Sequence, residues 1–336
     1  MRRVTLSDVA KVAGVDVSTA SRVLRGEERQ RVRKEIREKI IEAARQLDYS
    51  PDLLARALRT ARTQSLGLVV PQIDNPVFSD AIRGAEKAAR DAGYSLLISY
   101  RAEEWAKSGA LRRLSHAHRV DGLLVASLDS DEQLLEELES TGVPYIVLNR
   151  MLPGVRYSVV LDTRSAARIA VEHLISLGHS RIAHLAGRSG GYNAGERLSG
   201  YKQALEAGGV EYDPSLVASA GYTAEGGAEA LATILERSAP TAIFAASLVS
   251  AAGALSALHR LRIPVPEGMS LVAVHDAPVA EVLYPPLTTV ATPTYDMGRI
   301  GVELLLSLLD GNDPPPVDPL PPQGLILRAS TAPCSD

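Results

Sequence analysis

From residue 64 to about residue 290, short apolar runs alternate with longer amphipathic stretches, and this alternation limits the possible folds more than any other feature. Such runs predict buried strands, and the stretches between them predict helices. The expected strands form two series, 66–70, 95–99, 122–126, 144–148 and 158–161, then 181–186, 216–219, 242–246, 270–275 and 288–290. The expected helices are 78–92, 108–118, 131–141, 164–177, 194–208, 224–236 and 249–261. Two alternating series predict two α/β subdomains with doubly wound parallel sheets.

The first 60 residues follow a different, all-helical pattern. Residues 5–24, TLSDVAKVAGVDVSTASRVL, predict a helix, a tight turn and a second helix. Gly14 supplies the turn, and Ser7 and Asp16 are the candidate N-caps. Further helices are expected over 34–47 and, after Pro51, over 52–59. The second helix has the shape that enters a major groove of DNA.

Charge separates these two parts of the chain. Residues 1–62 hold 15 Lys and Arg against 9 Asp and Glu, whereas the remainder holds 21 against 31. A basic head on an acidic body indicates a polyanionic partner for the head alone. A solvated helical surface would explain the same charges, so charge alone does not decide between these two interpretations.

Several classes of protein are disfavoured. No apolar run approaches the roughly 20 residues of a membrane span, and the N-terminus has no secretory h-region. One cysteine, Cys334, excludes an internal disulfide, and we expect a cytoplasmic protein. No metal-ligand spacing, Walker loop or GxSxG is present. The glycine-rich GRSGGYNAG lacks the strand–GxGxxG–helix arrangement of dinucleotide-binding proteins, so we expect it to form a surface loop that lines a cleft. Because none of these catalytic or cofactor motifs is present, we expect neither an enzyme nor a bound cofactor.

Polar residues follow several of the expected strands. In parallel doubly wound sheets, ligands bind outside the carboxyl ends of the strands. The residues at these positions are Asp74, Asn75, Asn149, Arg150, Ser247, His275 and Asp276. The proline-rich run 312–322 predicts irregular structure, either a linker or tail, or a connection to one more strand in the GLILR that follows.

Over nearly its whole length the chain resembles the lactose-repressor (LacI/GalR) family of bacterial transcription regulators. The matching stretches are TLSDVAKVAGVDVSTASRVL, YSPDLLARALRT, SLGLVVPQIDNPVFSDAIRGAEKAARDAGY, RVDGLLVAS, HLISLGHSRIAHLAG, RLSGY and PPLTTVATPTYDMG. The resemblance implies a DNA-binding headpiece, a hinge helix, and a dimerising core similar to periplasmic sugar-binding proteins. The implied boundaries are 1–48 for the headpiece, 49–62 for the hinge and 63–333 for the core. Within the core, the N-subdomain would cover about 64–162 and 292–323, and the C-subdomain about 163–291 and 324–333.

The resemblance also assigns DNA contacts. The base-reading positions are Val17, Ser18 and Arg22, and an arginine there can donate two hydrogen bonds to guanine. The alternative for Arg22 is a contact to phosphate only. The phosphate contacts expected from side-chain chemistry are Thr5, Ser7, Thr19 and Ser21. In the hinge, Leu58 matches a leucine that wedges into the minor groove and kinks DNA, with Arg56 and Arg59 following that groove.

Two headpiece residues depart from the family pattern. Arg33 stands where a serine usually caps the third helix, at a cost of order 1 kcal/mol for the lost cap. Asp48 stands where glycine commonly ends that helix, although aspartate tolerates the left-handed conformation better than most residues. Neither change removes a group that reads a base.

An effector cleft between the subdomains is implied by the same resemblance. Its matching positions are Asp74, Val77, Phe78, Asn149, Arg150, Asn193, Arg197, Tyr222, Ser247, His275 and Asp276. The family commonly has Asp-Arg where this chain has Asn149-Arg150. It commonly has Asn-Asp where this chain has Ser247-Leu248, and Asp-Asp where this chain has His275-Asp276. Since acidic acceptors suit sugar hydroxyls, we hypothesise an effector that is not a typical neutral sugar: anionic, weakly hydroxylated or absent. Whether His275 contacts an effector or packs silently beside the cleft stays open.

These observations predict a homodimeric, sequence-specific transcription regulator that binds a pseudo-palindromic site in double-stranded DNA. A repressor gated by a small molecule is favoured, and the direction of gating is open. A nonspecific architectural DNA-binding protein is the first alternative, and a solute-binding protein is the second. No leucine-heptad tail follows residue 330, which favours a dimer over a tetramer.

Overall fold

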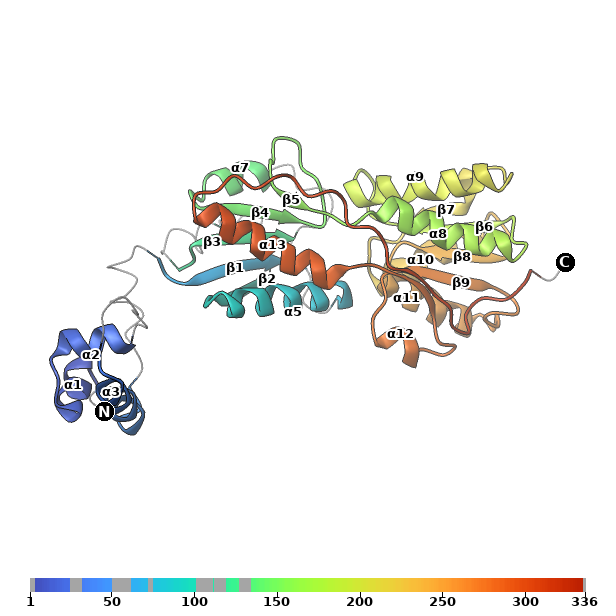
Figure 1. Cartoon of the computed structure of the whole chain (residues 1–336). Coiled ribbons are helices and arrows are strands. Elements are labelled where there is room, and N and C mark those ends of the chain that lie inside the picture. The colour runs from blue at the N-terminus through green and yellow to red at the C-terminus, as the bar shows by residue number, and fades with distance from the viewer. Residues whose placement is uncertain are drawn as a thin grey trace. The chain divides into compact units, whose positions relative to one another are not determined.

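A computed structural model describes residues 4–24, 32–49, 62–71, 75–100, 111, 119–126 and 134–334, without the side chains of residues 77 and 100. The chain divides into two compact units, Met1–Thr63 and Gln64–Asp336 (Figure 1). The first unit is helical, and the second contains two α/β subdomains, as the sequence predicts. No helix within the described ranges is long and apolar enough to cross a bilayer.

In the described residues of unit 1, three short helices surround a small aliphatic core. The helices are α1 (Leu6–Ala13), α2 (Val17–Leu24) and α3 (Lys34–Gln46). Val9, Ala20 and Ile40 are fully buried and pack together at the centre. Gly14 has φ 65°, which confirms its predicted role in the turn between α1 and α2.

The ends of these helices test the predicted caps. The N-cap of α1 is Thr5, so the prediction of Ser7 is wrong. The reason is Asp8, whose side chain accepts from the Thr5 backbone while the Thr5 hydroxyl accepts from the Asp8 backbone, a reciprocal capping box. Arg33 gives α3 no side-chain cap, and Asp48 takes φ 49°, both as expected.

The first subdomain of unit 2 has a five-stranded, wholly parallel sheet in the order β2-β1-β3-β4-β5. Its strands are β1 (Ser65–Val70), β2 (Ser95–Tyr100), β3 (Gly122–Ala126), β4 (Tyr145–Leu148) and β5 (Ser158–Val159). Its helices are α5 (Pro76–Asp91), α7 (Leu134–Glu139) and α13 (Thr294–Leu309). The helix expected over 108–118 lies outside the described residues except at Leu111.

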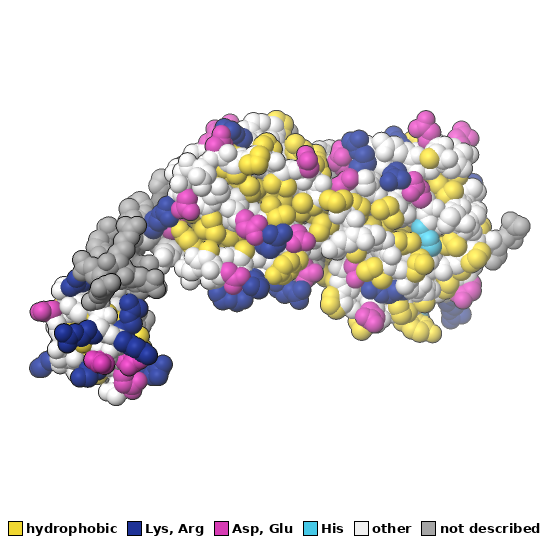
Figure 2. Space-filling model, in the orientation of Figure 1, with side chains coloured by type: hydrophobic (Ala, Val, Ile, Leu, Met, Phe, Trp, Pro, Cys, Tyr) yellow, Lys and Arg dark blue, Asp and Glu magenta, His cyan; other side chains and the backbone are white. Residues whose placement is uncertain are grey.

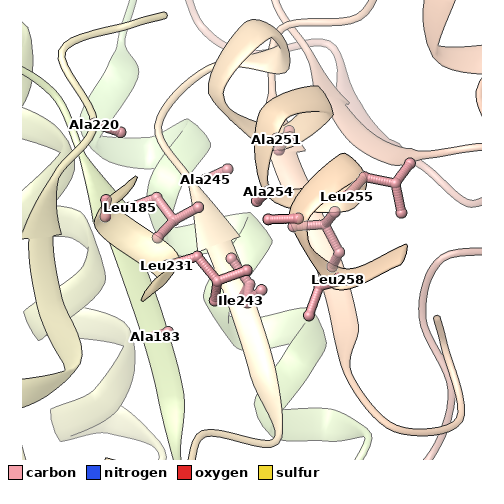
Figure 3. Close-up of a cluster of buried hydrophobic side chains, with 14 of the residues drawn as sticks. Ala183, Leu185, Ala220, Leu231, Ile243, Ala245, Ala251, Ala254, Leu255 and Leu258 are labelled. Carbon is pink, nitrogen blue, oxygen red and sulfur yellow. The ribbon is translucent and has the colours of Figure 1, made fainter. Parts of the chain in front are cut away.

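The second subdomain has a six-stranded sheet in the order β11-β10-β9-β8-β6-β7, in which only β11 is antiparallel to its neighbour. Its strands are β6 (Ile182–Ala186), β7 (Val217–Ser219), β8 (Ala242–Ala245), β9 (Ser270–Val274), β10 (Thr288–Ala291) and β11 (Gly324–Ile326). Its helices are α8 (Thr163–Ser176), α9 (Tyr192–Ala207), α10 (Ala224–Leu235), α11 (Leu248–Arg260) and α12 (Val279–Val282), with a 3₁₀ turn at Pro214–Leu216. Figure 3 shows one of its cores, where Leu185, Leu231 and Leu258 pack between sheet and helices.

The chain crosses between the subdomains three times. It passes from β5 to α8, from β10 to α13, and from α13 to β11 (Figure 1). The third crossing is the proline-rich run, in which Leu320 forms a parallel bridge with Leu161. Since β11 follows it, the expectation of one more strand in GLILR is confirmed, and the run is a connection within the core.

Helices α5 and α13 lie side by side at unusually close range. A Cβ on Gly298 would stand 1.9 Å from the carbonyl oxygen of Ala81, and one on Gly84 would stand 2.0 Å from that of Tyr295. Each glycine therefore lets the opposite backbone approach where any side chain would collide. This contact fixes α13, whose residues follow the second crossing, to the first subdomain.

Candidate functional site

The DNA-reading candidates lie at the exposed start of α2. Val17 is the first residue of the helix and is 46% exposed, and Ser18 beside it is also exposed. Arg22 follows one turn later, and its Nε donates to the Ser18 carbonyl oxygen at 3.0 Å. Its Nη2 lies 3.5 Å from Ser18 Oγ and 3.4 Å from Thr19 Oγ1. The structure thus brings Ser18 and Arg22 together at one edge of the helix.

The candidate phosphate contacts lie near the starts of α1 and α2. Thr5 and Ser7 are exposed, and the Thr5 hydroxyl donates to Asp8 Oδ2 at 2.7 Å as part of the cap. Thr19 and Ser21 are partly buried on α2. Helix N-termini favour anions, so this placement suits a phosphate backbone. Arg56, Leu58 and Arg59 lie outside the described residues.

Another face of unit 1 is acidic. A shallow depression beside Gly14 is lined by Glu35, Glu38 and Glu42 of α3, with Lys39 the one basic residue in its lining. Carboxylates repel phosphate, so this face of α3 is unsuited to DNA. The contrast favours the exposed edge of α2 as the nucleic-acid surface of the unit.

The candidate effector site is a buried polar cluster in unit 2. Asn193 and Arg197 are four residues apart on α9, which places both side chains on one face of that helix. Asn193 Nδ2 donates to the Asn149 carbonyl oxygen at 2.6 Å. Arg197 donates to His275 Nε2 at 2.9 Å and to the Tyr222 hydroxyl at 3.4 Å. The residues assigned from the sequence therefore form two bonded groups, Asn193 with Asn149 and Arg197 with His275 and Tyr222, and helix α9 joins the groups.

Three of these residues have left-handed backbones. Asn149 follows β4 with φ 66°, His275 follows β9 with φ 72°, and Tyr222 follows the β7 strand end with φ 67°. Asparagine and histidine take this conformation more readily than most residues, whereas it is uncommon for tyrosine. Strained residues of this kind concentrate at ligand sites, where the surrounding structure holds them in place.

The protonation of His275 follows from its partners. A guanidinium can only donate, so His275 Nε2 must accept, and the ring proton lies on Nδ1. Nδ1 then donates to Thr292 Oγ1 at 2.7 Å. Burial and the nearby charge of Arg197 lower the pKa of His275 well below its ordinary value. The ring is therefore neutral.

Two threonines at the crossings complete the cluster. Thr292 follows β10 at the start of the second crossing, and Thr163, at the first crossing, donates to Asn193 Oδ1 at 3.4 Å. Neither was expected from the sequence. The available signal was position, since each follows a strand at the point where the chain leaves a subdomain.

Two polar atoms of the cluster are buried without a hydrogen-bond partner among the described residues. They are Oδ1 of Asn149, a residue 8% exposed, and Nε of Arg197, a residue 3% exposed. Buried donors and acceptors are nearly always satisfied, so orphaned ones need an explanation. One unpartnered acceptor and one unpartnered donor in this cluster fit the polar groups of a small ligand.

Other predicted effector residues are not part of this cluster. Ser247 Oγ accepts from the Ser250 backbone at 3.2 Å and caps α11. Asp276 pairs with Arg328 at 2.8 Å and accepts from Thr289. Phe78 is buried in the core of the first subdomain. Asp74 and the Val77 side chain lie outside the described residues, and Arg150 is buried next to Asn149.

Comparison with known proteins places this architecture. Residues 5–52 match the model of "Bacterial regulatory proteins, lacI family", and residues 171–331 match the "Periplasmic binding protein-like domain". The HTH-type transcriptional regulator CelR of Thermobifida fusca is 35% identical, over 98% of each chain. The chain belongs to the LacI family. It is a DNA-binding transcriptional regulator, and this confirms the family and fold class expected from the sequence.

Solved structures agree with this LacI-family assignment. The CelR–cellobiose complex is 34% identical with a TM-score of 0.74, and covers 98% of this chain and 100% of its own. The lac repressor dimer bound to operator and the anti-inducer ONPF is 27% identical with a TM-score of 0.84, over 98% and 100%. These LacI-family neighbours are regulators with DNA and small-molecule ligands, not enzymes.

Within this LacI-family core, the three departures noted in the sequence have different settings. Asn149 and His275 lie in the polar cluster, where each replaces a commonly acidic residue by a neutral one. Ser247 is a helix cap outside the hydrogen-bonded cluster. The changes at 149 and 275 therefore alter the charge of the candidate site, whereas nothing in the structure links Ser247 to it.

Proposed function

We propose that this chain represses transcription as a cytoplasmic homodimer on a pseudo-palindromic operator, and that a small molecule bound at the polar cluster gates DNA binding. The observation that carries the proposal is that the cluster spans both subdomains. Asn193 of the second subdomain holds the carbonyl of Asn149, which ends a strand of the first. A ligand at these contacts acts directly on the relative pose of the subdomains.

The crossings strengthen this argument. His275 holds Thr292, the residue that leads from β10 into α13, and Arg197 holds His275. Helix α13 is in turn locked onto α5 by glycine contacts. Contacts thus run without interruption from a ligand-anchor residue to the main helix pair of the first subdomain, and a ligand shifts this pose by its differential affinity for the two states.

For the organisation of the chain we propose a headpiece at 1–48, a hinge at 49–62 and a core at 63–333. The effector set is Asn149, Asn193, Arg197, Tyr222 and His275, with Asp74, Val77, Phe78, Arg150, Ser247 and Asp276 remaining predictions. We assign no catalytic or cofactor role to any of these residues.

A second copy of the chain is the proposed occupant of an apolar surface around α12. Val282 and Tyr284 are 79% and 92% exposed, and Val279 is also exposed. Figure 2 shows hydrophobic side chains grouped over α12 on the visible face. The dimeric assembly of the lac repressor neighbour supports this assignment. Val282→Asp with Tyr284→Asp should yield monomers in sedimentation experiments, and an unchanged dimer would contradict the surface assigned.

Selection of DNA sequences by the full-length protein tests the regulatory function. A pseudo-palindromic selected site is expected, and uniform footprints on unrelated DNA would instead establish the architectural alternative. Arg22→Ala should relax the preference at one base position in each half-site, by about 1–3 kcal/mol. Uniform weakening at every position would instead assign Arg22 to phosphate. Repeating the selection with a metabolite panel tests gating separately.

A further inference from the structure

We propose that the ligand of the polar cluster carries an anionic group, a carboxylate or a phosphate, that binds the guanidinium of Arg197. This inference rests on the proposed function of the cluster as the effector site. It goes beyond that function by naming the charge of the ligand. The cluster is defined here by Asn149, Asn193, Arg197, Tyr222 and His275 with their crossing threonines.

The first step is the isolation of the Arg197 charge. The residue is 97% buried, and all its contacts are with neutral groups: the Tyr222 hydroxyl, the His275 ring, and the Tyr222 ring face at 5.6 Å from Cζ. It forms no ion pair within the part of the chain that the structure describes. A buried charge is costly unless it is paired, so the site is short of one negative charge.

The second step is the state of His275. Its ring accepts the hydrogen bond from Arg197 and is neutral, so it orients the guanidinium without compensating its charge. Its other nitrogen is committed to Thr292. The arginine is therefore held in a fixed position by a partner that supplies no charge, and its Nε remains open to an acceptor.

The third step is that nearby carboxylates are engaged elsewhere. Asp276, next to His275, is bound through both oxygens by Arg328, at 2.8 and 3.3 Å. Glu196, next to Arg197, is bound by Arg164 at 2.9 and 3.1 Å. Neither can turn to Arg197 without breaking these pairs. These two carboxylates therefore do not supply the missing charge, and in our proposal it comes from a molecule that enters the site.

The side chain of Asn149 restricts the chemistry of the ligand further. Asn149 Oδ1 is a buried acceptor without a partner, and it requires a donor such as a hydroxyl or amide N–H. A molecule with an acidic group and a nearby hydroxyl satisfies Arg197 and Asn149 together. Hydroxylated organic acids and phosphorylated polyols have this chemistry, and neutral sugars lack half of it.

The decisive variants differ only in charge at position 275. His275→Asp places a carboxylate beside Arg197, and His275→Asn is its neutral match. Aspartate and asparagine are among the residues most tolerant of the left-handed backbone found there. The variants are compared with the wild type as full-length proteins. Circular dichroism of each confirms folding before ligands are added.

The probes are pairs that differ mainly in an acidic group: ribose 5-phosphate with ribose, and glucuronate with glucose. Inorganic phosphate at constant ionic strength serves as a minimal probe. Calorimetry and thermal unfolding report binding. In the wild type and His275→Asn, we expect an anionic probe to bind about ten- to a hundredfold more tightly than its neutral twin. In His275→Asp this advantage should disappear. The two anionic probes also distinguish phosphate from carboxylate.

Three outcomes would overturn the inference. They are equal binding of anionic and neutral twins by the wild type, unchanged anion binding by His275→Asp, and no anion-specific stabilisation by any probe, phosphate included. Operator binding measured with the same probes separates this inference from the proposed function. An anion that binds without changing operator affinity contradicts gating alone, whereas gating by a neutral sugar contradicts only the inference.

Discussion

A buried histidine beneath the candidate site leads to a quantitative prediction about stability. His184 lies on β6 and is 0% exposed, and its ring stacks against Phe244 and against Tyr201, at 4.6 and 5.1 Å between centroids. Its Nδ1 lies 3.2 Å from the Phe244 carbonyl oxygen, so the neutral ring donates there, and its Nε2 has no partner among the described residues. Burial lowers the pKa of His184 from 6.5 to about 4.

The sign and size of the effect follow from this pKa. Between pH 6.5 and 4 the unfolded chain binds a proton at His184 that the folded chain does not, so folding loses stability as the pH falls through this window. One pKa unit corresponds to about 1.4 kcal/mol, which gives about 3 kcal/mol over the whole range. Between pH 7.5 and 5.0 the loss should be about 2 kcal/mol, and above pH 7 the contribution is constant.

Urea unfolding of the wild type and His184→Phe, followed by circular dichroism at pH 7.5 and 5.0, measures this effect. Phenylalanine keeps a flat ring in the stack and does not titrate. His173 and His179, whose pKa values are also lowered by burial, are present in both proteins. The difference between the two pH dependences therefore isolates His184. The wild type should lose about 2 kcal/mol more than the variant on acidification.

The same difference tests the burial of the ring. If both proteins lose the same stability to within about 0.5 kcal/mol, the His184 ring is protonated in the folded state or reached by water, and the reasoning fails. A variant that unfolds at pH 7.5 would show instead that the hydrogen bond to Phe244 outweighs the cost of the orphaned Nε2. His184→Leu, which also lacks a titrating group, then supplies the pH comparison.

Gly298→Ala should lower the free energy of unfolding by about 1–3 kcal/mol because of the collision with Ala81, whereas Gly195→Ala, with open space around it, should not. Equal losses in urea unfolding would contradict the close α5–α13 contact. Asp276→Asn should cost about 1–3 kcal/mol of stability through Arg328 while leaving the affinity for anionic probes unchanged. A loss of probe affinity in calorimetry would instead place Asp276 in the site. Leu58→Ala should reduce the bending of bound DNA in fragment-mobility assays, and unchanged bending would refute the minor-groove wedge.

The architecture of the core is largely predictable because period and alternation are properties of short stretches. The helix expected over 164–177 is observed at Thr163–Ser176, and most described strands agree with their predictions to within one residue. Helix α13 is the main omission, since no helix is predicted between 292 and 323. Its burial depends on Gly84 lying against Tyr295 and Gly298 lying against Ala81 across two distant segments, and no local pattern encodes those contacts.

The candidate site likewise has a part that the sequence predicts and a part that only the structure shows. Helical spacing predicts that Asn193 and Arg197 share a face, and position after a strand identifies Asn149 and His275. Which partner each side chain chooses is a tertiary property. Asp276 and His275 are neighbours in sequence with the same strand-end signal, yet Arg328 takes one and Arg197 takes the other.

Replacing an acidic partner of a buried arginine by a neutral histidine changes what a ligand can contribute. An arginine already paired with a carboxylate is compensated in the empty site, so a neutral ligand can bind without a charge penalty. With His275 as partner, Arg197 is held in place but remains uncompensated, and the empty state bears the cost. An anion bound to Arg197 removes that cost. The contacts of Arg197 lead through His275 and Thr292 to α13. In our proposal the same substitution therefore selects the charge of the ligand and places its binding energy on the connection between the subdomains.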